Sequence, residues 1–326
     1  MKRDRERGVA LLTVLLLVAV MSALAVGVLD DIRFGLRRAA NAETVGQAQW
    51  YALGAESLAR ARLARLGAAN PMQTSLAGDW NGRWLSFPID HGTIRARLTD
   101  ATGCFNLNSV VQGAADQWTR RDLGIAQFLA LLQQLGVPQG QAQGLAEALA
   151  DWIDSDGQRN TMGAEDDSYA NMVRPYRTSG ALLSEVSELR TIRGFTPEMY
   201  ARIRPYICAL PTADLSPINI NTLDADHAVL LSMLTEGGLE QQTARGLILA
   251  RPPNGWPSVD AFWNSPPMRT QLPPDAVLNQ VTLRTRFFNL EAEVEYAGGE
   301  AILTSLFEQP AMGPARIRAR RWTIDE

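Results

Sequence analysis

Apolar residues near the amino terminus form one unbroken run that then continues as a helical pattern. Residues 9–29 carry no charged side chain, and only Thr13, Ser22 and Gly27 interrupt the run. At about 1.5 Å per residue, a helix of this length covers roughly 30 Å, the thickness of a bilayer core. Residues 30–66 lack proline and predict an amphipathic helix, because apolar residues recur at Leu29, Ile32, Leu36, Val45, Ala48, Ala52, Leu53, Leu58 and Leu63.

Strand patterns follow the break at Gly67 and Pro71 and return near the end of the chain. Alternation of apolar and polar residues predicts strands at 93–99, 281–287, 290–296, 301–307 and, as an edge strand, 316–324. The stretch between the two strand regions is mostly helical in pattern. We therefore predict an α+β fold in which an antiparallel sheet domain, formed by 67–105 and 281–326, carries an inserted all-α domain at 106–280.

A weak repeat runs through the expected insertion. Glycines at 136, 194 and 237 each stand between two helical segments, which predicts helix–turn–helix units. These units resemble SAM-like and helix-hairpin-helix modules, some of which contact DNA, and an envelope DNA-uptake receptor is therefore an alternative function. The units lack a lysine-rich context, and the net charge is −4 with a pI near 5.4. This acidic balance opposes nucleic-acid binding, so we expect the units to make protein contacts.

The inventory of reactive residues argues against most catalytic and zinc chemistry. The chain has two histidines, His91 and His227, and two cysteines, all far apart, which disfavours a zinc site. We find no glycine-rich phosphate loop, serine elbow or histidine beside a nucleophile. A carboxylate-pair glycosidase remains open because acids are plentiful, but no pattern supports it, and we expect a protein that is not an enzyme.

Acidic residues gather in one segment of the insertion. Residues 147–167 contain seven acids against the single base Arg159. One interpretation is a solvated loop whose carboxylates stay apart. The other is a calcium loop, because Asp154, Asp156, Gln158 and Glu165 fall at relative positions 1, 3, 5 and 12 of the calcium-binding helix-loop-helix pattern. Arg159 stands where that pattern requires glycine, so the loop is not a true EF-hand.

Cys104 and Cys208 are the two cysteines of the chain. If the chain is exported to an oxidising compartment, these two residues most simply form one disulfide. Two buried free thiols are the alternative.

The amino terminus allows two interpretations. Lys2, Arg3, Arg5 and Arg7 precede the apolar run and hold its start on the cytoplasmic side. A secretory signal peptide could be cut after residues 23–25, which read Ala-Leu-Ala. The second interpretation starts from Gly8, which directly precedes the run, and from the helical pattern that continues beyond it. A cleaved signal peptide has no need to be fused in phase to a long amphipathic helix.

This arrangement resembles the type IV pilins and the pseudopilins of type II secretion. The resemblance implies cleavage of the leader 1–8 by prepilin peptidase between Gly8 and Val9, and methylation of the new amino terminus at Val9. The family places a glutamate at the fifth mature position, where this chain has Thr13. Loss of that glutamate and a large helical insertion are features of the K-type minor pseudopilin.

The acidic segment also resembles the K-type signature, and the resemblance implies structural calcium. We expect Asp154, Asp156, Glu165 and Asp166 as ligands, with Asp151, Gln158, Asp167 and Asn171 in secondary positions. The implied partners are the I- and J-type and then the H-type pseudopilins in a tip complex, prepilin peptidase and the inner-membrane assembly platform. The implied location is the bacterial inner membrane, crossed once by 9–29, with the bulk of the chain in the periplasm and a role in initiating pseudopilus assembly for protein export.

Overall fold

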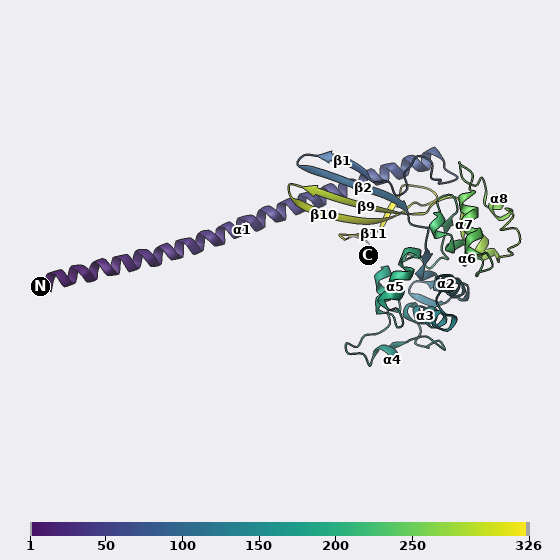
Figure 1. The fold of residues 1–326 in the computed structure, drawn as a ribbon, viewed down its shortest axis with the longest axis horizontal. Helices are drawn as coiled ribbons and strands as arrows, with labels where there is room; N and C mark the ends of the chain where they lie inside the picture. Colours follow the sequence, from purple (N-terminus) through teal and green to yellow (C-terminus); the bar gives the residue numbers. More distant parts are fainter. Residues whose placement is uncertain (1, 324–326) are drawn as a thin grey trace.

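One helix dominates the shape of the protein. The structure is a computed structural model that describes residues 2–323, with side-chain surroundings described for residues 10–323. Helix α1 (Lys2–Ala69) projects as a stalk at one end and lies on a sheet at the other (Figure 1). It extends slightly past the predicted end at 66. Gly8 and Val9 fall within α1, but their side chains lie outside the described part.

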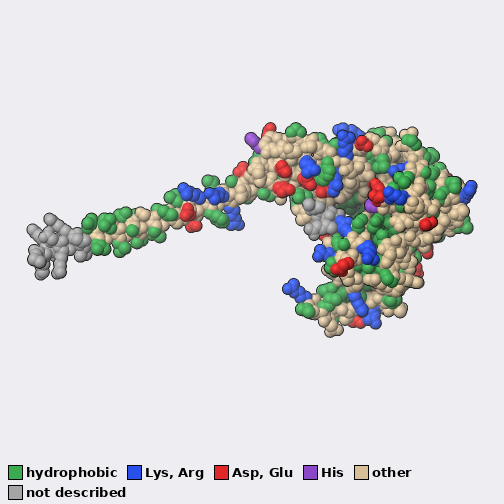
Figure 2. Space-filling view, viewed as in Figure 1, with side chains coloured by type: hydrophobic (Ala, Val, Ile, Leu, Met, Phe, Trp, Pro, Cys, Tyr) green, Lys and Arg blue, Asp and Glu red, His purple; other side chains and the backbone are tan. Residues whose placement is uncertain are grey.

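The projecting half of α1 has the character of a membrane anchor. Every side chain from 10 to 43 is exposed. Within the described residues, α1 is the one helix long and apolar enough to cross a membrane, judged by length and composition. Figure 2 shows hydrophobic side chains along the outer part of the stalk and charged ones nearer the sheet. The charged group consists of Asp30, Asp31, Arg33, Arg37 and Arg38.

The sheet is antiparallel throughout and is built from two distant parts of the chain. Its strand order is β1-β2-β9-β10-β11, so β1 and β11 form its two edges. The residue bounds are β1 (Leu85–Ile89), β2 (Gly92–Asp100), β9 (Phe287–Tyr296), β10 (Gly299–Glu308) and β11 (Arg316–Arg321). The predicted strands at 93–99, 290–296, 301–307 and the edge at 316–324 all overlap strands of this sheet.

Helix α1 covers one face of the sheet through a stripe of small side chains. Ala48, Ala52, Ala55, Ala59 and Leu63 are buried, and their spacing of three or four residues places them on one side of the helix. They pack against alternate residues of β9 and β10, among them Ala292, Val294, Ala301 and Leu303. Leu58 belongs to the apolar pattern of the sequence, but its side chain is 52% exposed. It lies outside the alanine stripe. The small side chains of the stripe allow the helix to approach the sheet closely.

The insertion is mainly helical and holds the largest core of the protein. Its α-helices are α2 (Asp122–Gln134), α3 (Gln139–Ile153), α4 (Asp166–Tyr169), α5 (Pro197–Ile203), α6 (Val229–Leu234), α7 (Gln241–Leu249), α8 (Val259–Trp263) and α9 (Asp275–Leu278). Four 3-10 helices accompany them, η1 (Leu107–Val110), η2 (Val186–Thr191), η3 (Arg204–Tyr206) and η4 (Ala225–His227).

The insertion also contains short strand pairs that an all-α prediction does not include. The parallel pairs are β3 (Phe105–Asn106) with β6 (Ile207–Cys208), and β7 (Ile218–Asn219) with β8 (Val281–Thr282). The hairpin is β4 (Val111–Ala114) with β5 (Gln117–Arg120).

The glycine repeat corresponds to real turns. The three glycines separate α2 from α3, η2 from α5, and α6 from α7. At Gly194 the backbone has φ +92°, and an added Cβ would lie 2.9 Å from Leu145 Cδ2. Glycine is required there both for its left-handed conformation and for the approach of the neighbouring helix.

A half-buried carboxylate joins the sheet to the insertion. Asp100, at the end of β2, accepts hydrogen bonds from the hydroxyls of Thr102, Thr222 and Thr285. Thr285 lies where we predicted one strand over 281–287, and the structure divides that stretch between β8 and the start of β9. The chain leaves strand geometry there, and the Thr285 N–H donates to Thr74 Oγ1 at 3.2 Å instead of to a neighbouring strand.

Candidate metal centre

The acidic segment begins where helix α3 ends. Asp154 caps the carboxyl end of α3, and its N–H donates to Ala150 O at 2.9 Å. The next residue, Ser155, is bound to the hairpin: its N–H donates to Trp118 O at 2.9 Å, and its Oγ accepts from Trp118 N–H at 2.7 Å. The hairpin thereby fixes where the loop leaves the helix, and the loop returns to the core at α4.

Three carboxylates meet in this loop. Asp154, Asp156 and Glu165 each bring an oxygen within 4.8 Å of the others. Asp156 is exposed, but Asp154 and Glu165 are only 4% and 5% exposed. Asp154 Oδ1 and Glu165 Oε1 are buried without a hydrogen-bond partner among the described residues. A buried carboxylate oxygen without a partner is costly, and a cation is the species that would satisfy both oxygens.

The charges at this cluster are poorly compensated by the protein itself. Burial, together with repulsion from the neighbouring carboxylates of Asp156, Asp151 and Glu165, raises the pKa of Asp154 to about 7. Burial also raises the pKa of Glu165 to about 7, with Asp151 adding repulsion. The carboxyl end of α3 is itself a negative pole. The environment therefore disfavours ionised carboxylates unless a positive ion lies between them.

The oxygen donors match a hard cation. Calcium takes six to eight oxygen ligands at about 2.3–2.6 Å and tolerates irregular geometry. Asp154, Asp156 and Glu165 would supply carboxylate oxygens, and water or backbone carbonyls would complete the shell. The residues present therefore fit calcium, whose role here would be to neutralise the loop and tie α3 to α4.

The other predicted ligands make different contacts. Asp166 Oδ1 accepts from the N–H and the hydroxyl of Thr178 at 2.9 and 3.1 Å, and Asp166 Oδ2 lies 3.8 Å from Arg177 Nε. Asp167 lies beside Arg159, with Nη1 and Oδ2 3.5 Å apart. Gln158 donates its backbone N–H to Asp156 Oδ1 at 2.8 Å. Asn171 is exposed.

Asp151 lies behind the cluster and organises the loop. Its carboxylate accepts from both the backbone N–H and the side-chain amide of Asn160. Gly163 lies so close that an added Cβ would stand 2.0 Å from Asp151 Oδ2. Burial raises the pKa of Asp151, while the Asn160 bonds lower it. Sequence reasoning missed Asn160 and Thr178, because neither has a spacing that relates it to a carboxylate.

The two cysteines lie on either side of the acidic segment in the sequence. The structure contains a disulfide between Cys104 and Cys208, whose Cα atoms are 5.7 Å apart. The adjacent β3–β6 pair aligns Asn106 with Cys208. Together the disulfide and the strand pair close the segment of the chain that holds the acidic loop.

A membrane-length helix packed on an antiparallel sheet, with a helical insertion that carries an acidic loop, defines a pilin-like subunit of the pseudopilin class. Two family profiles, both described as type II secretion system (T2SS), protein K, match residues 103–212 and 218–284. The chain belongs to the type II secretion system protein K family and is a minor pseudopilin of the K type.

Individual relatives are similar in sequence to this chain over most of its length. It is 38% identical to the type II secretion system protein K of Pectobacterium carotovorum subsp. carotovorum, over 80% of each chain. It is 40% identical to the Klebsiella pneumoniae protein K over 81% of each chain, and 33% identical to that of Pseudomonas aeruginosa over 98% of this chain and 93% of the relative.

A solved structure shares the fold. In the crystal structure of the GspK-GspI-GspJ complex from the enterotoxigenic Escherichia coli type 2 secretion system, one chain superposes with a TM-score of 0.76 at 30% identity. The match covers 87% of this chain and 98% of the other.

Proposed function

We propose that this protein caps the tip of the type II secretion pseudopilus and initiates its assembly. The observation that carries the proposal is Thr13, whose hydroxyl donates to Ala10 O of its own helix at 2.9 Å. A new amino-terminal amine in lipid needs a counter-charge, because an unpaired ion costs at least a few kcal/mol there. Thr13 has no charge to offer the amine of a following subunit. A chain without a charged residue at this position suits the tip of the filament, where no neighbouring subunit needs the counter-charge.

The position of the insertion supports the same placement. The insertion lies at the end of α1 opposite the amino terminus and extends to one side of the sheet (Figure 1). A subunit stacked beyond this end would have to displace the insertion, whereas a terminal subunit meets no such obstacle. The large insertion would hinder packing within a filament, but it is compatible with a position at the end of the filament.

Maturation and location follow from the anchor. In this proposal, prepilin peptidase cleaves between Gly8 and Val9, and the new amino terminus at Val9 is methylated. The mature α1 crosses the inner membrane once, and the sheet and insertion lie in the periplasm. The exposed half of α1, uncovered by any described part of this chain, would be covered by lipid and by the helices of other pseudopilins.

The partners in this proposal are other minor pseudopilins. The related GspK chain was crystallised in a complex with GspI and GspJ. We infer that this chain forms the corresponding tip complex with I- and J-type subunits, which the H-type subunit joins on the inner-membrane assembly platform.

Two measurements test the tip placement. Co-expression of the full chain with its I- and J-type partners should yield a ternary complex, and mass spectrometry should show loss of residues 1–8. Gly8→Phe should retain the leader. Immunogold labelling of overproduced pseudopili should place the protein at one end only. Labelling along the shaft, or intact leader on the unaltered chain, would contradict the proposal.

Calcium is the ligand proposed for the acidic loop, with a structural role. Asp154, Asp156 and Glu165 are the proposed ligands, supported by the unpartnered oxygens of Asp154 and Glu165. Asp166 would act through Thr178. The Thr178 hydroxyl bonds to Asp166, and it also lies 3.4 Å from Glu165 Oε2. Asp166 would therefore position Glu165 instead of binding the ion.

Isothermal titration with calcium tests this site on the full chain in detergent. Asp154→Asn should weaken calcium binding by about tenfold or more, because one charged ligand is lost. Asp167→Asn is the matched control and should bind calcium nearly as well as the unaltered chain, since Asp167 lies outside the three-carboxylate cluster. Equal losses in both variants, or no calcium binding at all, would contradict the site.

A further inference from the structure

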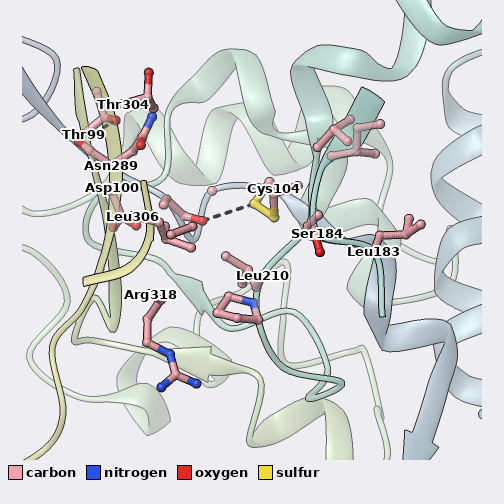
Figure 3. A pocket seen from close by; sticks show the side chains of 18 of the residues that line it. Thr99, Asp100, Cys104, Leu183, Ser184, Leu210, Asn289, Thr304, Leu306 and Arg318 are labelled. Atoms are coloured by element: carbon pink, nitrogen blue, oxygen red, sulfur yellow. Dashed lines mark hydrogen bonds between the residues drawn. A yellow bond between two sulfur atoms is a disulfide. The ribbon is translucent and has the colours of Figure 1, made fainter. Parts of the chain in front are cut away.

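A cleft separates the sheet from the insertion on the side away from α1. Its volume is about 750 Å³, within the range of about 300–1,000 Å³ that is usual for ligand sites. In Figure 3, Thr99, Asn289, Thr304 and Leu306 of the sheet lie on one side, and Leu183, Ser184 and Leu210 of the insertion lie on the other. The cleft lies apart from the acidic loop and from the alanine stripe of α1.

The sheet wall of the cleft is set by strand alternation. Residues Ala301, Leu303 and Phe307 of β10 are buried in the clusters beneath α1, so Thr304 and Leu306 point to the opposite face. The same alternation puts Thr99 of β2 and Asn289 of β9 on that face, and Ala319 of β11 continues it. The wall is therefore mixed, with hydroxyl, amide and small apolar groups in neighbouring strands.

The charged residues that line the cleft are almost all basic, namely Arg97, Arg204, Arg318 and Arg321, with His227 beside them. The one carboxylate among the lining residues, Asp100, already accepts hydrogen bonds from three threonine hydroxyls. Three of the arginines are paired with acids: Arg97 Nη2 lies 2.6 Å from Glu291, Arg318 Nε lies 3.3 Å from Glu308, and Arg321 Nε lies 2.7 Å from Glu185. These pairs hold the guanidinium groups in position, and a guanidinium has enough N–H donors to bind a second carboxylate.

One edge of the sheet borders this cleft. β11 is the last strand of the sheet and pairs within it only with β10. Arg318, Ala319 and Arg321 of β11 line the cleft, and Arg321 Nη2 reaches Ser184 O of the insertion at 2.6 Å. The opposite edge, β1, contains Pro88. Proline removes a backbone donor, so β11 is the better edge for pairing with another chain.

We propose that this cleft binds an extended acidic segment of a partner protein, which adds to β11 as a further strand. Strand addition uses the backbone edge for affinity, while alternate side chains of the added segment supply specificity. Arginines on an edge strand discourage pairing with unselected strands, and carboxylates on the incoming segment would turn that barrier into attraction. The proposal rests on the cleft and does not depend on the tip position or on calcium.

Fluorescence anisotropy with the full chain in detergent tests the proposal. The ligand is a labelled hexapeptide in which glutamate and valine alternate. We expect saturable binding that Arg318→Glu weakens by about tenfold or more. The milder Arg318→Gln, checked for an unchanged melting temperature, should weaken it less. Arg269→Glu, an exposed charge reversal outside the cleft, should leave the affinity unchanged.

Two further peptides separate strand addition from simple charge attraction. A hexapeptide with the same residues in two blocks, and an alternating one N-methylated at every second residue, should both bind weakly. The proposal is overturned if either binds as well as the alternating peptide, or if Arg269→Glu weakens binding as much as Arg318→Glu. It is also overturned if a short oligothymidylate competes equally well, or if no peptide binds.

Discussion

Glu56 on α1 and Arg320 on β11 form a bidentate ion pair between the helix and the sheet. Arg320 Nε and Nη2 donate to the two oxygens of Glu56 at 2.7 and 2.6 Å, and Ser305 Oγ donates to the same carboxylate at 2.6 Å. Glu56 is 4% exposed within an otherwise apolar helix–sheet contact. The pair fixes the register of α1 against β10 and β11, where the alanine stripe alone would allow sliding.

Glu56→Gln should therefore destabilise the junction between helix and sheet. The amide keeps the shape of the side chain but loses the charge that holds Arg320, which should cost about 1–2 kcal/mol. Chemical denaturation of the full chain in detergent measures the change. Glu43→Gln, an exposed position on the same helix, is the control and should change the free energy of unfolding little. Equal effects at the two positions would show that the pair contributes nothing.

The acidic loop should make stability depend on pH when calcium is removed. The pKa values of Asp154 and Glu165 are raised from 3.8 and 4.5 to about 7 in the folded chain. At a pH between these two sets of values, both carboxyl groups are ionised in the unfolded chain but still protonated in the folded chain. The free energy of unfolding should thus fall as pH rises from about 4 to 7, by about 1–3 kcal/mol.

Thermal unfolding with a chelator at pH 5 and pH 8 measures this effect. We expect a lower melting temperature at pH 8, and calcium should reverse the loss by stabilising the ionised carboxylates. The double variant Asp154→Asn, Glu165→Gln should show a smaller pH dependence and no response to calcium. If the double variant keeps the full pH dependence, other groups are responsible.

Helix α1 and the sheet could be predicted from the sequence because their patterns are local. The apolar run to residue 29 and the alternation in β2, β9 and β10 follow directly from side-chain periodicity. The buried face of α1 was harder, because Ala55 and Ala59 pack on the sheet while Leu58 does not. Which side of a helix meets a sheet depends on the partner strands, and small residues give a weaker signal than leucine.

The carboxylate cluster of the acidic loop was predicted only in part, for a similar reason. The spacing of Asp154, Asp156 and Glu165 is visible in the sequence, and the structure brings these three together. Asp166 bonds to Thr178 instead. That contact joins residues twelve positions apart through an irregular loop, and no periodicity indicates it. Asn160 on Asp151, and Thr285 on Asp100, are likewise contacts that only the folded chain creates.

The disulfide between Cys104 and Cys208 should contribute strongly to stability. It closes a loop with a sequence separation of 104 residues, and such a crosslink typically stabilises by about 2–4 kcal/mol. The double variant Cys104→Ser, Cys208→Ser avoids a stray thiol and should unfold at lower denaturant. Alkylation without reductant, followed by mass spectrometry, should leave both cysteines of the purified chain unmodified. Modification of both would contradict the disulfide in the native protein.

Gly163, a buried position in the acidic loop, should tolerate no side chain. Its Cβ would stand 2.0 Å from Asp151 Oδ2, a carboxylate that is buried and bound by Asn160. Gly163→Ala must displace Asp151 or the loop, which should cost about 1–3 kcal/mol and weaken calcium binding. Gly157→Ala is the control, because nothing lies within 4 Å of its added Cβ. Melting temperature and calcium titration of both variants decide the matter. If Gly163→Ala binds calcium as tightly as Gly157→Ala, then the contact between Gly163 and Asp151 does not shape the loop.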